Sequence, residues 1–385
     1  MSETPEQAYI SKVHLKGYKS IRDLEIDFKP GLNIIIGPNG SGKTNFLEFL
    51  KNSLERNYIE LNGNFSFAFK FENINISTWE ASYTYKRHNN HNIIKEIFDD
   101  KEPFNIVYPD NSKLKSFQNI GGITPYIEVS ELRPFCKINY NTPLNIPLLD
   151  SPYSTDENQL FNFPEFASFE EFIDKKLNHI SYSLQGFSQE IAGENLSTFF
   201  KADVKMIENL QRFSPIKNFE ISESARYIPN NNQYHLAFLS YLFFVNDKWL
   251  TWKQLSDGTK RLFYIIHEVT YFERGIYLIE EPELGIHPDQ LHKLMDFLIE
   301  QSKEKQIIIT THSPEVLNAI HPDELDRIIV TRYDAEKGTI MRKLSPEQAK
   351  EMGERIKEGD MFLSDRWVHL NLEDEIFNAA QLNEK

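Results

Sequence analysis

The chain has 385 residues, a formal net charge of −15 and 40% hydrophobic residues, which is the composition of an ordinary globular protein. Its one cysteine, Cys136, excludes a disulfide within the chain and predicts a cytoplasmic location. No apolar run approaches the ~20 residues that cross a bilayer, so we expect no membrane partner. The negative charge argues against broad non-specific binding to nucleic acid or anionic lipid, although it leaves room for a local basic groove.

The first 85 residues read as strands around one helix. Residues 9–15 and 23–28 alternate apolar and polar side chains and predict a hairpin that turns near residues 17–20. An apolar run at 32–36, a glycine-rich turn and an amphipathic segment from residue 46 predict a strand, a loop and a helix. The aromatic-rich stretches 64–71 and 78–85 predict further antiparallel strands.

The pattern weakens between residues 86 and 220. Proline and asparagine interrupt residues 125–164, and apolar residues then recur at helical spacing through 166–180. No heptad repeat with flanking charges is present, which argues against a long coiled coil. We therefore expect a mostly helical insertion or lid.

Short strands and helices alternate again from residue 234. Residues 234–245 predict a strand or hairpin, and the helix that follows residues 255–261 ends at Gly275. Buried strands are predicted at 276–279 and 307–309, and a hairpin at 327–344. Ser313 before Pro314 predicts a capped helix start, and Ser345 with Gln348 predicts a capping box on a helix that Gly359 closes.

This order predicts an α/β fold with a parallel or mixed sheet between helices and an antiparallel β subdomain. Because both ends carry strand–helix units, they must meet with the middle looped out. The expected domains are 1–85, 86–220 (the insertion), 221–345, and a helical tail at 346–385.

The glycine-rich turn is Gly37-Pro38-Asn39-Gly40-Ser41-Gly42-Lys43-Thr44, a complete Gly-x-x-x-x-Gly-Lys-Thr loop between a strand and a helix. Glycines let the backbone approach phosphate closely, and successive N–H groups with the helix N-terminus form an anion cradle. Lys43 would add a charge near the outer phosphates, and the Thr44 hydroxyl would ligate Mg²⁺. The loop predicts a site for a nucleoside triphosphate.

Carboxylates and a histidine follow the two later buried strands. Glu280 and Glu281 lie where strand 276–279 ends, and ligands bind at that edge of open α/β sheets. One carboxylate can hold Mg²⁺ through water, and its neighbour can position the attacking water. His312, at the end of strand 307–309, can contact a γ-phosphate, although a lone histidine is more often structural.

Ser256-Asp257-Gly258 stands at the start of another predicted helix and offers a second anion-facing surface. An ordinary helix cap is the alternative interpretation. Since the chain already has one phosphate cradle, a second is best explained by contact with the nucleotide of another copy.

Together these stretches resemble the ABC-type ATPases of the SMC/RecF-like group, in particular the AAA-labelled ATPases related to the nucleotide-binding half of OLD-family nucleases. The resemblance covers about residues 9–54 and 234–332. It rests on Walker A (37–44), a signature motif (255–260), Walker B with the D-loop (YLIEEPELGIHP, 277–288), the switch histidine (311–313) and the entry motif Tyr18-Lys19-Ser20-Ile21-Arg22.

The resemblance implies an ABC-type ATPase head, ATP and Mg²⁺ as cofactors, and specific roles for residues. Glu281 is implied as catalytic base and His312 as its switch partner, and Thr44 with Glu280 as metal ligands. The implied nucleotide contacts are Asn39, Gly40, Ser41, Gly42, Lys43, Thr44 and Arg22, with Ser256 and Gly258 facing the γ-phosphate held by a second subunit. Gln118 and Gln159 are the candidates for a Q-loop glutamine.

The resemblance further implies a head-to-tail homodimer or higher homo-oligomer. We expect it to gate a separate effector, a nuclease or toxin, in prokaryotic anti-phage defence, since residues after 344 leave little room for a nuclease domain. The alternatives are an ATP-dependent clamp on nucleic acid of the RecF/SMC repair type, and a scaffold or sensor that hydrolyses ATP slowly.

Overall fold

The computed structural model describes residues 9–54, 58, 61, 63–73, 77–86, 91–99, 104–109, 129–132, 204–228, 233–251, 254–271, 276–359, 362–369 and 376–377. The chain separates into two units. The first comprises Met1–Leu132, Arg274–Glu283 and Leu298–Lys385, and the second Arg133–Glu273 and Leu284–Phe297. The predicted domain boundaries stay a prediction.

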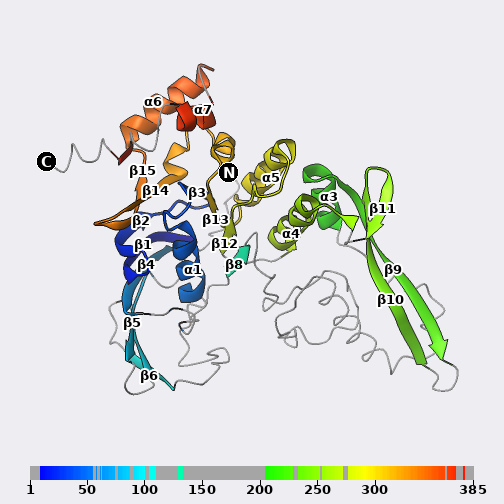
Figure 1. The fold of residues 1–385 in the computed structure, drawn as a ribbon, viewed down its shortest axis with the longest axis horizontal. Coiled ribbons are helices and arrows are strands. Elements are labelled where there is room, and N and C mark those ends of the chain that lie inside the picture. The colour runs from blue at the N-terminus through cyan, green and yellow to red at the C-terminus, as the bar shows by residue number, and fades with distance from the viewer. Residues whose placement is uncertain are drawn as a thin grey trace. The chain divides into compact units, whose positions relative to one another are not determined.

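A mixed sheet dominates the first unit, with the described strands in the order β7-β6-β5-β4-β1-β2-β15-β14-β3-β13-β12-β8 (Figure 1). Their bounds are β1 Tyr9–Tyr18, β2 Ile21–Asp27, β3 Leu32–Ile36, β4 Phe65–Glu72, β5 Thr78–Lys86, β6 His91–Phe98, β7 Phe104–Pro109, β8 Val129–Leu132, β12 Ile276–Glu280, β13 Gln306–Thr311, β14 Ile328–Asp334 and β15 Gly338–Lys343. The strands β14, β3, β13, β12 and β8 are parallel to one another, and the strands from β7 to β2 pair antiparallel. This confirms the predicted α/β class and the antiparallel subdomain.

The central parallel strands are rich in apolar residues because both of their faces are buried. All five residues of β3 and of β12, and all six of β13, are buried. Neighbouring β13 pairs with β3 in register, Thr311 opposite Ile36, and with β12, Thr310 opposite Glu280. The carboxyl ends of β3, β13 and β12 therefore lie at one edge of the sheet.

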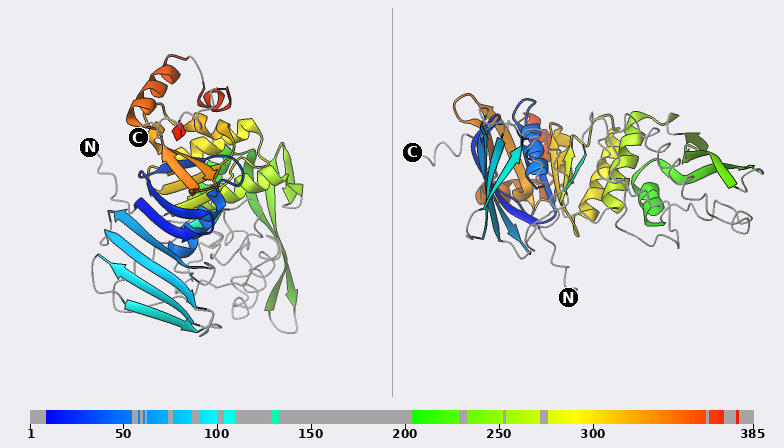
Figure 2. Two further views of the ribbon diagram at one scale, coloured as in Figure 1. Left: turned by 60° about the vertical axis from the view of Figure 1, so that its left-hand side comes forward. Right: turned by 90° about the horizontal axis from the view of Figure 1, so that it is seen from below.

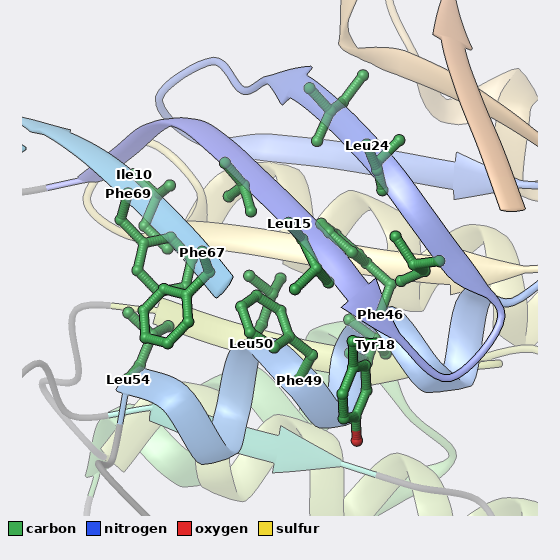
Figure 3. Close-up of a cluster of buried hydrophobic side chains, with 14 of the residues drawn as sticks. Ile10, Leu15, Tyr18, Leu24, Phe46, Phe49, Leu50, Leu54, Phe67 and Phe69 are labelled. Carbon is green, nitrogen blue, oxygen red and sulfur yellow. The ribbon is translucent and has the colours of Figure 1, made fainter. Parts of the chain in front are cut away.

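Helix α1 (Lys43–Leu54) supplies much of the core of this unit. Its side chains Phe46, Phe49, Leu50 and Leu54 face Leu15 and Tyr18 of β1 and Phe67 and Phe69 of β4 (Figure 3). The rings of Phe49 and Phe67 lie 5.2 Å apart in an edge-to-face arrangement, which aromatic pairs favour. This packing anchors the helix that begins at the phosphate loop.

Strands β6 and β7 correct part of the sequence prediction, because both lie inside the stretch 86–220 that was expected to be mostly helical. They extend the antiparallel layer that Figure 2 shows as neighbouring arrows. In β6 the buried positions are Ile94, Glu96 and Phe98. Glu96 accepts a hydrogen bond from the Tyr58 hydroxyl at 2.7 Å. Because Glu96 is a charged residue at a buried position, the sequence of β6 lacks the alternation of apolar and polar residues that indicates a strand.

Residues 133–203, which include the helices predicted there and Gln159, lie outside the described residues, and so does Gln118. Within the second unit, helix α3 (Val204–Phe213) confirms helical structure at the end of this stretch. The strand predicted at 234–245 is β10 (Gln233–Val245), which pairs with β9 (Ile216–Ile228) and β11 (Lys248–Thr251). Helix α4 (Asp257–Tyr271) packs on these strands, with the Phe263 ring 5.0 Å from that of Phe243.

The other helices of the described residues include α5 (Pro288–Gln301), α6 (Pro346–Lys357), α7 (Leu363–His369) and two short 3₁₀ helices, η5 (Pro314–Ala319) and η6 (Leu325–Arg327). The predicted helix after Ser313 is the single 3₁₀ turn η5, and Ser313 makes no side-chain cap there. In the part of the chain that is described, no helix is long and apolar enough to cross a membrane.

Candidate functional site

The phosphate loop lies between β3 and α1, at the edge where the parallel strands end. Gly37 N–H donates to the Thr311 carbonyl at 3.3 Å, and Ser41 N–H donates to the Pro38 carbonyl at 3.3 Å. The Lys43 ammonium donates to the carbonyls of Gly37 at 2.7 Å and Pro38 at 2.9 Å, and Lys43 is only 6% exposed. These bonds hold the loop closed around the lysine at the start of the helix.

Two glycines of the loop have no room for a side chain. A Cβ on Gly37 would lie 2.1 Å from the Thr331 carbonyl oxygen of β14. A Cβ on Gly42 would lie 2.1 Å from Thr339 Oγ1 of β15, and Gly42 has a φ of +102°. Asn39 and Gly40 are exposed at the tip of the loop. The loop therefore packs against the β14–β15 hairpin on one side and presents its tip to solvent on the other.

The proposed metal ligands meet although they are far apart in the sequence. The Thr44 hydroxyl, on the first turn of α1, donates a hydrogen bond to Glu280 Oε1 at the end of β12. Glu280 is 9% exposed. A hydroxyl and a carboxylate are the hard oxygen donors that Mg²⁺ prefers, so the pair fits the ion that the loop motif implies.

Glu281 is the next residue, and its backbone turns into an unusual conformation. Its φ is +46°, which side chains other than glycine rarely adopt, and its N–H donates to the Thr310 carbonyl at 2.7 Å. The side chain is 22% exposed, and its Oε1 lies 3.1 Å from Nδ1 of His312, a residue of which the side chain is 40% exposed. Strain of this kind recurs at functional sites, and here it turns the carboxylate toward the histidine.

The structure also brings in Glu283, which the sequence reasoning did not single out. Its Oε1 accepts a hydrogen bond from Thr311 Oγ1 at 2.5 Å and from the His312 backbone N–H at 3.3 Å. The same oxygen lies 3.5 Å from His312 Nδ1, and the side chain is 9% exposed. Its position in the acidic run Glu-Glu-Pro-Glu gave no sign of this contact, which depends on the neighbouring strand.

Not every predicted nucleotide contact joins this cluster. The Arg22 guanidinium donates to the carbonyls of Glu336 and, at 3.0 Å, Ala335 in the β14–β15 turn. Nearby, Ser20 Oγ accepts from Asn45 Nδ2 of α1 at 2.9 Å and lies 2.8 Å from Thr339 Oγ1. Within the entry motif, Ser20 thus contacts the helix that follows the phosphate loop, whereas Arg22 binds the turn of the β14–β15 hairpin.

The signature residues belong to the second unit. Ser256 Oγ accepts from the Thr259 N–H at 3.2 Å, so it caps the start of α4, and its side chain is exposed. A Cβ on Gly258 would lie 2.3 Å from the Gly285 carbonyl oxygen, so a close backbone approach also requires this glycine. The ordinary-cap interpretation of Ser256 is therefore satisfied locally, and its role toward a nucleotide stays a prediction.

Comparison with known families finds one model, AAA_21, described as "AAA domain, putative AbiEii toxin, Type IV TA system", that matches residues 32–318. The match begins in β3 and runs through the phosphate loop, both carboxylates and His312, to the turn η5.

Among curated proteins, Endonuclease GajA of Bacillus cereus is 24% identical over 87% of this chain, and the chain spans 62% of its length. Septu protein PtuA of Bacillus thuringiensis is 24% identical over 91% of this chain and 82% of its own. A short stretch is 54% identical over 39 residues, 10% of this chain and 11% of the relative, to the DNA replication and repair protein RecF of Desulfitobacterium hafniense.

Among solved structures, the Smc head domain of Pyrococcus furiosus with the C-terminal domain of ScpA aligns over 91% of this chain and 100% of its own, with a TM-score of 0.49 and 15% identity.

Proposed function

The chain belongs to the AAA_21 family, within the SMC/RecF-like group of ABC-type ATPases, and from this premise we propose that it binds and hydrolyses ATP. One observation carries the proposal. The Thr44 hydroxyl donates to Glu280 across 236 positions of sequence, while Glu281 meets His312 at 3.1 Å on the adjacent strand. A phosphate cradle, an oxygen donor pair and a carboxylate–imidazole pair then share one edge of the sheet, as phosphoryl transfer to water requires.

The proposed chemistry divides among the side chains. The loop amides and Lys43 bind the phosphates, and Thr44 and Glu280 hold Mg²⁺. The ion, when bound, neutralises charge on the phosphate oxygens. Glu281, exposed enough to meet solvent, positions the attacking water and accepts its proton, and His312 orients that carboxylate.

We further propose that ATP joins two copies head to tail, with Ser256 and Gly258 of one copy facing the γ-phosphate held by the other. The exposed N-terminus of α4 supports this assignment, since helix N-termini attract anions. The dimer in turn would gate a nuclease or toxin effector in defence against phage. Support comes from the toxin named in the family description and from the endonuclease named among the relatives.

The decisive test of the ATPase proposal is Glu281→Gln. The substitution removes the base and keeps the shape, so the rate of phosphate release should fall at least about 100-fold. ATP binding, followed with a fluorescent ATP analogue, should persist because the cradle is intact.

Glu304→Gln is the matched control for this test, because it makes the same change at an exposed residue just before β13, at the opposite end of the strand. It should hydrolyse ATP at the wild-type rate. Wild-type turnover by Glu281→Gln would refute the assignment.

A further inference from the structure

Glu283 has the contacts of a residue that positions the catalytic histidine. One of its carboxylate oxygens accepts two hydrogen bonds at the end of β13, from Thr311 Oγ1 at 2.5 Å and from the His312 N–H at 3.3 Å, and lies 3.5 Å from His312 Nδ1. Its side chain is 9% exposed, compared with 22% for Glu281. Glu283 is thus less accessible to water than Glu281, and its hydrogen-bond partners are protein groups.

Thr311 carries this effect further. It is fully buried at the end of β13. Its Oγ1 donates to Glu283 and accepts from the Ser313 N–H at 2.9 Å, and its carbonyl accepts from the Gly37 N–H at 3.3 Å. The backbone on both sides of His312, and the first residue of the phosphate loop, are therefore tied to Glu283 directly or through Thr311.

The imidazole ring is set by the same contacts. Glu281 Oε1, at 3.1 Å, and Glu283 Oε1, at 3.5 Å, both face Nδ1 of His312. Glu281 accepts a hydrogen bond only when Nδ1 bears the proton, and the nearby negative charge of Glu283 also favours a proton on Nδ1. Nε2 then carries no proton, so it is left to accept a hydrogen bond, for example from a water.

The second carboxylate oxygen of Glu283 affects the stability of the folded protein. Among the described residues, Oε2 is buried and has no hydrogen-bond partner. A buried carboxylate oxygen without a partner destabilises a protein, and such groups recur where they serve function. Glu283 therefore fits a functional role better than a purely structural one.

We propose that Glu283 is a positioning residue for hydrolysis. It fixes the Thr311–Ser313 turn and the tautomer of His312, and it leaves Glu281 for the attacking water. This inference rests on the proposed ATPase activity, and it divides the acidic run Glu280, Glu281 and Glu283 into a metal ligand, a base and a positioning group.

The kinetic test is Glu283→Gln, which keeps an acceptor for Thr311 and removes the charge. We expect kcat to fall about 10- to 100-fold, as when a group that orients a catalytic side chain is lost. KM for ATP should change less than about two-fold, because the substitution removes no contact that binds ATP equally in the ground state and the transition state. The melting temperature should stay close to that of the wild type, because the amide oxygen of Gln can still accept from Thr311 Oγ1 and the His312 N–H.

Two further variants separate positioning from folding. Thr311→Val removes the hydroxyl that links Glu283 to Ser313 and should lower kcat, whereas Thr311→Ser keeps the hydroxyl and should restore it. A Glu283→Gln protein with wild-type kcat, or one whose loss of activity follows a loss of melting temperature, would overturn the proposal.

A readout that needs no hydrolysis keeps the inference separate from the ATPase proposal. In protein labelled with ¹⁵N-histidine, the His312 ring signals, assigned with His312→Asn, should report the Nδ1–H tautomer, and Glu283→Gln should shift the ring toward the Nε2–H form. If the wild-type protein does not hydrolyse ATP but this shift occurs, the ATPase proposal fails and the positioning role stands. An unchanged tautomer in the variant would refute the positioning role.

Discussion

Gly37 illustrates how a single position in the phosphate loop serves two neighbours. Its N–H binds the Thr311 carbonyl of β13, and its Cα faces the Thr331 carbonyl of β14 so closely that a Cβ would lie 2.1 Å from the oxygen. The obstacle is backbone in a buried strand, which has no rotamer with which to move away. Three residues on, a Cβ added to Gly40 would meet no heavy atom of the described residues within 4 Å, and Gly40 has a φ of +81°.

Gly37→Ala should therefore cost more than Gly40→Ala. The first overpacks the contact between β3 and β14 and should destabilise by about 1–3 kcal/mol. It should also weaken ATP binding, because the loop begins at this residue. The second carries only the backbone cost of a left-handed alanine, about 1–2 kcal/mol. Thermal melting with and without ATP measures both effects, and a smaller loss of melting temperature without ATP in Gly37→Ala than in Gly40→Ala would contradict the packing argument.

At this scale, residues with local partners or within a motif of fixed spacing were predictable, and a residue outside any motif whose partner lies on another strand was not. His287, which stands before Pro288, accepts the Asp289 N–H at 3.3 Å ahead of α5. Lys43, Thr44, Glu280 and His312 were assigned from motif spacing, and the structure gathers them at one sheet edge. Glu283 escaped notice because its partner Thr311 is 28 positions away on another strand. Nothing in the run Glu-Glu-Pro-Glu distinguishes its third carboxylate from a solvated one.

Among whole elements, the capping of α6 follows directly from sequence. Ser345 Oγ accepts from the Gln348 N–H at 3.2 Å, and Gln348 Oε1 accepts from the Ser345 N–H at 2.9 Å. Pro346 opens the helix, and Gly359, with a φ of +79°, follows its C-cap. Ser313-Pro314 has the same dipeptide yet opens the 3₁₀ helix η5 without a side-chain cap, and the Ser313 N–H donates to Thr311 Oγ1. The dipeptide alone therefore does not specify a capped α-helix.

Ser345→Ala tests the value of this cap. The change removes one side of the capping box and should destabilise the protein by about 0.5–2 kcal/mol. Urea or thermal unfolding measures the loss. Ser345→Thr, which keeps a hydroxyl, should retain most of the stability, and equal losses in both variants would show that the hydroxyl does not act as a cap.

For the molecule as a whole, the two ends of the chain were predictable and the middle was not. Strands at 9–109 and 276–343 assemble into one sheet, as the paired motifs required. Apolar alternation identified β1, β2, β4 and β5, but β6 carries the buried Glu96 and did not show it. The phosphate loop and the signature helix fall in separate units.

The proposed assembly makes a prediction that neither unit makes alone. If each ATP lies between the phosphate loop of one copy and Ser256 of another, Lys43→Ala and Ser256→Arg should each abolish hydrolysis. Lys43→Ala weakens phosphate binding by the loop, and Ser256→Arg blocks the opposite side of the site. In a mixed dimer, the intact loop of the Ser256→Arg chain meets the intact Ser256 of the Lys43→Ala chain. One site is then complete, and the other carries both defects.

Equal mixing of the two inactive proteins, followed by exchange of subunits, should therefore restore about one quarter of the wild-type rate if subunits pair at random in a two-fold dimer and the sites act independently. A mixture of Lys43→Ala with the double variant Lys43→Ala/Ser256→Arg is the control, because none of its dimers contains an intact loop. A site built within one chain predicts no recovery in either mixture, and recovery confined to the first mixture can arise only if the chains exchange halves of a shared site.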